Sequence, residues 1–152
     1  MAQRGAVLAA GTGIALGLVG TAPAYAANDW DDYSDLVTRM PDDIPSRSDI
    51  LQYKGGLVTY KIGWNGTKVV WLDVSATDER ADGYNIVVQV RYQSYRNGVW
   101  SGWQYRQPAT AKDMSKSTVY KIYKNTVPIK NLHVRGCYAE GSVIVNCDNT
   151  WH

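Results

Sequence analysis

The chain has 152 residues, with 16 Lys and Arg against 14 Asp and Glu and a formal net charge of +2. This near balance argues against a nucleic-acid-binding protein and against a strongly charged membrane-binding protein. The length is sufficient for one domain with a core of its own, even after an N-terminal leader is set aside.

The first 26 residues have the order of a secretory signal. Arg4 is followed by an uncharged run over residues 5–20, and Ala24 and Ala26 occupy the two small-residue positions of a cleavage site. A membrane anchor is the alternative, but it needs about 20 apolar residues and this run is shorter. We therefore expect cleavage between Ala26 and Ala27, which makes the protein secreted (extracellular), bacterial in style and free of the membrane after processing.

Residues 27–54 are expected to form an acidic N-terminal unit ahead of a β domain over 55–152. A helix is predicted over 28–40, because an Asn-Asp pair can cap it, acidic residues fill its first turn and Pro41 ends it. Residues 41–49 show no period and predict a connecting segment. The sequence leaves open whether the acidic unit docks on the β domain, with Trp30 and Tyr33 as anchors.

From Gly55 onward apolar residues recur with a period of two, which is typical of strands. The predicted strands are 57–64, 67–77, 84–95, 99–106, 118–123, 132–138 and 143–147. Asn65-Gly66 and Asn97-Gly98 are the dipeptides that tight hairpin turns prefer, and residues 107–116 are expected to form a loop. The expected fold class is all-β, an antiparallel two-sheet sandwich or small barrel of about seven strands with a short N-terminal helix.

Two cysteines in an exported chain predict a disulfide between Cys137 and Cys147. This bridge conflicts with the simplest final hairpin, because a turn over 139–142 places Cys137 opposite Ile144 and leaves Cys147 too far away. A longer loop, a bulge or a chain that leaves the ladder after Val145 would resolve the conflict.

The aromatic residues are 11 Tyr and 6 Trp with no Phe, so every ring carries a hydrogen-bonding edge suited to a wet surface. Strand parity predicts an aromatic–basic face that binds a ligand through Trp71, Arg91, Tyr95, Trp100, Trp103 and Tyr105. Arg96 and Arg106 are expected beside it. The alternative is that these rings pack on one another and on arginines merely to cover a sheet face.

Two neighbouring segments of this region are Val90-Arg91-Tyr92 and Val99-Trp100-Ser101-Gly102-Trp103. Together they resemble the strand pair of the fibronectin type III domains of cytokine receptors, in which Trp and Arg side chains interleave. Gln104 replaces the second serine of that family's motif, and the flanking chain differs. The likeness covers about 20 residues and carries no function over.

Over its whole length the chain combines a short leader, Tyr- and Trp-rich strands and a cysteine-containing final hairpin. In these features it resembles small secreted actinomycete β-proteins of unassigned function. This likeness implies an exported β-protein and no particular activity.

Residues typical of catalysis are sparse. His133 has no accompanying nucleophile motif and is best read as a surface histidine. The acids available for paired-carboxylate hydrolysis are Asp73, Asp78, Glu79, Asp82 and Glu140. A calcium site at the aspartates of residues 29–35 lacks the glycine and terminal glutamate of a calcium loop. No metal or other cofactor is expected.

The function expected from these observations is that of a non-enzymatic binding module, a monomer that recognises a polysaccharide or an extracellular protein. An inhibitor of another secreted protein is the alternative, presenting the loop Gln107–Ser117 with Lys112, Met114 and Lys116. A hydrolytic enzyme is the third possibility.

Overall fold

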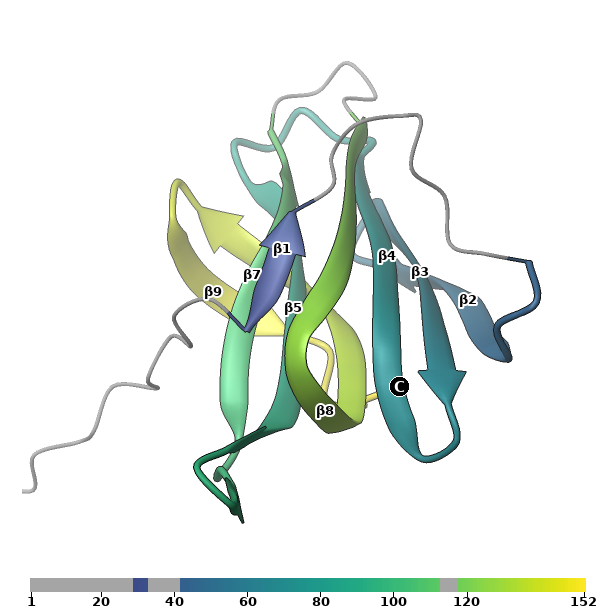
Figure 1. The fold of residues 1–152 in the computed structure, drawn as a ribbon. Helices are drawn as coiled ribbons and strands as arrows, with labels where there is room; N and C mark the ends of the chain where they lie inside the picture. The colour runs from purple at the N-terminus through teal and green to yellow at the C-terminus, as the bar shows by residue number, and fades with distance from the viewer. Residues whose placement is uncertain (1–28, 33–41, 113–117) are drawn as a thin grey trace, which may run out of the picture.

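The computed structural model describes residues 29–32, 42–112 and 118–152. In this part of the chain all regular structure is β-strand, and no helix that could cross a membrane is found. The strands are β1 (Trp30–Asp32), β2 (Ser46–Tyr53), β3 (Gly56–Asn65), β4 (Lys68–Asp78), β5 (Asn85–Arg96), β6 (Val99–Trp100), β7 (Gln104–Ala111), β8 (Thr118–Glu140) and β9 (Val143–Cys147). They form one antiparallel sheet in the order β2-β3-β4-β8-β5-β6, with β1 and β9 beside β8 and β7 beside β5 (Figure 1). Its ends do not pair with each other, so the sheet is not a closed barrel.

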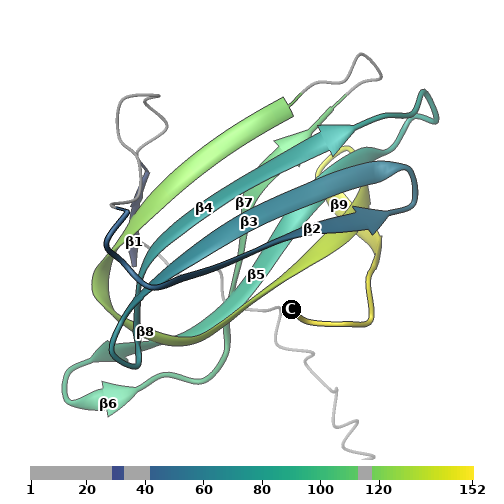
Figure 2. The same ribbon diagram turned by 90° about the vertical axis from the view of Figure 1, so that its right-hand side faces the viewer.

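β8 joins the two halves of the sheet. Its first part pairs with β4 and its second part with β5, and Ile129 lies opposite Val69 on one edge and Ser94 on the other. The sequence predicted two separate strands here, but the strand continues through Pro128, where a shift of register in the β4–β8 ladder accommodates a residue without an amide proton. The shift in the β5–β8 ladder lies further along, between Lys130 and His133. β8 is strongly curved in this region (Figures 1 and 2).

The inner face of the sheet is the face that carries the core, and the opposite face is called outer. The largest fully buried inner side chains are Tyr92, Ile62, Leu72, Ile86, Ile129, Val58, Val69, Val74, Val88, Val90 and Val134. Their alternation confirms the period of two that predicted β3, β4 and β5. The halves of the sheet approach closely, because a Cβ built on Gly136 of β8 would lie 3.2 Å from Cβ of Tyr53 in β2.

The predicted turn at Asn97-Gly98 is confirmed, with φ angles of 50° and 83°. Two consecutive positive φ angles give the backbone twist that two-residue hairpins need. The first hairpin differs by one residue, because Asn65 pairs with Lys68 and the turn consists of Gly66 and Thr67.

β2 corrects the prediction of a connecting segment over 41–49. Residues 46–49 belong to this edge strand, which pairs with β3 through a turn at Lys54 and Gly55, both with positive φ. The side chains from Ser46 to Ile50 are all exposed, so neither face of this stretch carries the apolar alternation that marks a half-buried strand. The sheet therefore extends across the boundary expected between 27–54 and 55–152.

Residues 30–32 form the strand β1, so the prediction of a helix is wrong for these three residues. Residue 28 and residues 33–40, which belong to the same predicted helix, lie outside the described residues. Trp30 pairs with Asn125 of β8, and its side chain is 5% exposed. Its ring meets the ring of Tyr92 edge-on at 5.7 Å between centroids and that of Tyr123 at 6.5 Å. Burial of a large aromatic side chain in the core outweighs the local preference for a helix.

Asp29 provides a buried polar connection beside β1. Its side chain is 2% exposed, its Oδ2 accepts a hydrogen bond from the Tyr92 hydroxyl at 3.2 Å, and its Oδ1 accepts one from Arg96 Nε at 2.8 Å. A buried carboxylate is stable only when it is paired in this way. The start of the acidic segment thus docks against the inner face, with Trp30 as the anchor.

β7 corrects the loop predicted over 107–116, because residues 107–111 continue the strand. Ala109 and Ala111 are buried in the core, and the backbone oxygen of Pro108 accepts a hydrogen bond from the Tyr123 hydroxyl at 2.7 Å. The end of β7 was not predicted as a strand because alanine and proline are not typical strand residues. The small alanine side chains nevertheless allow this part of the strand to lie against the core. In the predicted inhibitory loop, residues 107–111 are strand and residues 113–117 lie outside the described residues. Lys112 is therefore the one described residue of this loop that lies outside the strand.

Candidate functional site

The register of three strands places side chains in rows across the outer face. Tyr105 of β7 and His133 of β8 lie opposite Arg91 of β5, one on each side of it. Gln89 and Arg135 lie opposite each other in the next row. Residues that face each other in neighbouring strands point to the same side of the sheet. These side chains therefore share one surface.

The guanidinium group of Arg91 is held between two indole rings. Its Cζ lies 4.6 Å from the ring centroid of Trp103 and 4.5 Å from that of Trp151. The Cζ of Arg135 lies 4.2 Å from the Trp151 ring. We call Trp103, Arg91, Trp151 and Arg135 the Trp–Arg stack. Each such contact contributes about 0.5–1 kcal/mol at an exposed site, so the stack has a defined geometry before any ligand binds.

Trp103 is positioned by the short segment between β6 and β7. Ser101 N donates to the backbone oxygen of Ser94 at 2.8 Å, and Ser94 N donates to Ser101 Oγ at 3.0 Å. Gln93 Nε2 donates to the backbone oxygen of Ser101 at 3.0 Å. The chain is thus fixed two residues before Trp103, whose side chain stays 42% exposed.

A second group of rings lies at the end of β5. The rings of Tyr95 and Trp100 are 5.1 Å apart between centroids, and Lys130 Nζ lies 4.2 Å from the Trp100 ring. Lys130 is held beside this group by the pairing of its backbone with Gln93. We call Tyr95, Trp100 and Lys130 the Trp100 group.

Trp151 reaches the stack through the tail that follows β9. Asp148 N donates to the backbone oxygen of Gly136 at 2.9 Å. His152 and Val134 each donate a backbone N–H to the other's oxygen at 2.9 Å. The tail is therefore fastened to β8 on both sides of Trp151.

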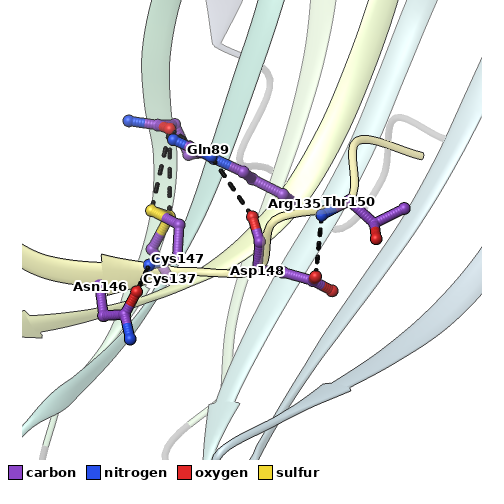
Figure 3. Close-up of a disulfide and its surroundings, with 7 residues drawn as sticks. All are labelled: Gln89, Arg135, Cys137, Asn146, Cys147, Asp148 and Thr150. Carbon is purple, nitrogen blue, oxygen red and sulfur yellow. Dashed lines mark hydrogen bonds between the residues drawn. A yellow bond between two sulfur atoms is a disulfide. The ribbon is translucent and has the colours of Figure 1, made fainter.

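The predicted disulfide between Cys137 and Cys147 is present and fastens the start of this tail (Figure 3). The two cysteines are direct partners across the β8–β9 ladder. The register conflict is resolved by two features. Glu140 pairs with Val143, so the turn is shorter than predicted, and a shift of register after Tyr138 leaves one extra residue, Val145, in β9.

Gln89 links the disulfide to the Trp–Arg stack (Figure 3). Its Oε1 accepts a hydrogen bond from Arg135 Nε at 2.8 Å and lies 4.0 Å from both sulfur atoms. The sulfur contacts are not hydrogen bonds, because a disulfide carries no S–H. Arg135 Nη1 also donates to the backbone oxygen of Asp148 at 3.3 Å. The tail and the stack are therefore parts of one network.

The structure brings together five of the six predicted ligand-binding residues, in two adjoining sets. In the first set, Arg91 and Trp103 belong to the Trp–Arg stack, and the ring centroid of Tyr105 lies 6.2 Å from that of Trp151. In the second set, Tyr95 and Trp100 belong to the Trp100 group.

Trp71 lies apart from them. It belongs to β4, which β8 separates from β5, and its side chain is 6% exposed. Strand parity alone did not reveal this burial.

The two additional arginines also lie elsewhere. Arg96 bonds to Asp29, and Arg106 stacks on Tyr123 at 4.9 Å, both toward the inner side. Of the three arginines expected around the face, only Arg91 belongs to it.

Sequence reasoning missed Trp151, Arg135 and Lys130 as members of the site. Trp151 lies far from β5 in the chain, and only the disulfide, four residues earlier in the sequence at Cys147, signals that this tail returns to the sheet. Lys130 was hidden because the strand through Pro128 was not predicted.

His133 has its ring 5.9 Å from that of Trp103. Burial, and then the positive charges of Arg91 and Arg47, lower the pKa of His133 below its usual value. His133 is therefore neutral at pH 7 and serves as a flat polar neighbour of the stack.

Two of the acids considered for hydrolysis have partners of their own. Burial raises the pKa of Asp73, which faces Lys61 across the β3–β4 ladder. Asp82 accepts a hydrogen bond from Tyr138, which lowers the pKa of Asp82 and raises that of Tyr138 to about 12. Within the described ranges no three His, Cys, Asp or Glu residues are grouped in a way that could hold a metal ion.

One shallow pocket among the described residues lies away from the stack, beside the β3–β4 turn. Its volume is about 430 Å³, and Trp64, Asn65 and Asp43 contribute to its lining. None of the predicted ligand-binding residues lines it.

The fold and the site define an all-β protein with one open antiparallel sheet and a preorganised array of aromatic and basic side chains on its outer face. No protein-family model matches the chain, and neither the curated proteins nor the solved structures gave a match.

Proposed function

We propose that this protein is a secreted binding module that recognises a polysaccharide or an extracellular protein through the Trp–Arg stack and the Trp100 group. The observation that carries the proposal is the state of Trp103, which is 42% exposed yet fixed against Arg91. An exposed aromatic ring that is already ordered loses little conformational freedom when a ligand stacks on it. Rings of this kind are common anchors in binding surfaces.

Secretion is part of the proposal. The disulfide supports it, because such bridges persist mainly in oxidising compartments. The leader over residues 1–26, with cleavage between Ala26 and Ala27, is the predicted route. We further propose that the protein is bacterial, monomeric, independent of cofactors and without catalytic activity.

We also propose that the two halves of the sheet pack as the two layers of a sandwich. The short approach between Gly136 and Tyr53 supports this arrangement, as does the one between Gly56 and Ile86, where a Cβ on Gly56 would lie 2.1 Å from Ile86 Cγ1. The outer site then lies on the surface of one layer.

Inhibition of another secreted protein has less support, because most of the described part of its proposed loop is strand β7.

Sedimentation with insoluble chitin, cellulose and bacterial cell wall tests the proposed function. We expect the wild-type protein to pellet with at least one of these materials and Trp103→Ala to stay largely in the supernatant, because a fixed ring for stacking is lost. Trp64→Ala is the matched control and should pellet like wild type, since Trp64 lies at the other pocket. Equal pelleting of Trp103→Ala and wild type would place binding elsewhere.

A further inference from the structure

The outer face around the stack carries an excess of positive charge. Arg91, Arg135 and Lys130 contribute positive charges. The outer residues of β5 on either side of Arg91 are uncharged: Gln89 lies opposite Arg135, and Gln93 lies opposite Lys130. The carboxylate of Asp148 offsets part of the charge of Arg135; it lies 3.7 Å from His152 and accepts a backbone hydrogen bond from Thr150. The surface therefore favours an anionic ligand.

Arg91 has donors that the described residues do not use. Its Cζ lies over the rings of both Trp103 and Trp151, and a guanidinium donates its N–H groups outward in its own plane. Its Nε is buried with no hydrogen-bond partner among the described residues, so a ligand on the surface would have to bond to the Nη groups. The edge of a guanidinium matches a carboxylate, which can accept two parallel hydrogen bonds.

The face repeats the combination of ring and cation. Trp103 lies against Arg91, and Trp100 lies against Lys130. Arg91 and Tyr95 are four residues apart on β5, which is about 13 Å in an extended strand. A polymer that carries a ring and a carboxylate in each repeat can occupy both pairs at once, with an increase in affinity that a single anion does not obtain.

We infer that the ligand of this face is a polysaccharide with carboxylate groups, whose sugar rings stack on Trp103 and Trp100 while its carboxylates bond to Arg91 and Lys130. This inference rests on the proposed function and specifies its ligand. It selects a uronic-acid type of polymer over a neutral polysaccharide and over an acidic polypeptide.

The test compares polygalacturonate with its full methyl ester, which keeps the sugar backbone and removes the charge. We expect the purified full chain to bind polygalacturonate at least about tenfold more tightly, the effect of one or two lost charged hydrogen bonds. Arg91→Gln and Lys130→Gln should each move the affinity toward that for the methyl ester. Arg106→Gln, which removes an arginine from the inner side, should not. Lys130→Gln keeps the test valid if Arg91→Gln fails to fold.

The outcomes separate the two levels of the proposal. Equal binding of the acid and the ester, lost in Trp103→Ala, overturns the anionic ligand and leaves the binding module intact. Binding of polyglutamate as tightly as polygalacturonate overturns the choice of a sugar. Failure to bind either polymer while neutral polysaccharides bind also overturns the inference, and failure to bind any polysaccharide overturns the polysaccharide part of the proposed function as well.

Discussion

Trp30→Ala is expected to lower the free energy of unfolding by about 3–5 kcal/mol, the usual range for removal of a buried tryptophan. The side chain is 5% exposed and contacts the rings of Tyr92 and Tyr123, so the substitution leaves a cavity in the core. Equilibrium unfolding in urea measures the change.

Trp103→Ala is the control for this prediction, because Trp103 is 42% exposed and does not belong to the core cluster. Its loss should cost only about 1 kcal/mol, the contribution of its contact with Arg91. If Trp30→Ala were no more destabilising than Trp103→Ala, then β1 would not be an integral strand of the sheet.

Replacing both cysteines by serine is expected to weaken both folding and ligand binding. The bridge closes a short loop with a sequence separation of 10, for which chain entropy gives about 2–3 kcal/mol of stability. The tail that carries Trp151 also loses its covalent attachment to β8. Trp151 then stacks on Arg91 for only part of the time, and we expect an affinity loss of about tenfold, equivalent to about 1.4 kcal/mol.

Trp151→Ala distinguishes these two effects. It should reproduce the loss of affinity while it retains most of the stability, because the disulfide and the Asp148 backbone bond remain. Isothermal titration calorimetry and urea unfolding on the same samples measure both quantities. Unchanged affinity in the double serine variant would show that the tail holds Trp151 without the bridge.

The strands predicted best are those with one face in the core. β3, β4 and β5 alternate apolar and polar residues, and the asparagine–glycine pair at residues 97–98 fixes one of their turns. β2 was missed because it is an exposed edge strand held by backbone pairing, and the end of β7 was missed because alanine and proline carry little strand signal. β1 depends on a distant partner in β8, which no local pattern specifies.

The site was predictable where it depends on neighbouring strands of one hairpin. Arg91 and Trp103 follow from parity and a short turn, and the structure places them in contact. Trp151 depends on the return of the tail to β8, and the burial of Trp71 depends on the arrangement of the whole sheet. Parity predicts the face on which a side chain lies, but not what covers it.

The most direct test of the outer face as the binding site is a titration followed by NMR of the tryptophan indole N–H signals, assigned by single substitutions. With polygalacturonate as the ligand, the Trp103 and Trp100 signals should shift most, because the sugar rings are expected to stack on these two indoles. The Trp30 signal, from the core, and the Trp64 signal, from the pocket beside the β3–β4 turn, should stay in place. Shifts confined to Trp64, with Trp103 and Trp100 unchanged, would contradict binding at the Trp–Arg stack and the Trp100 group.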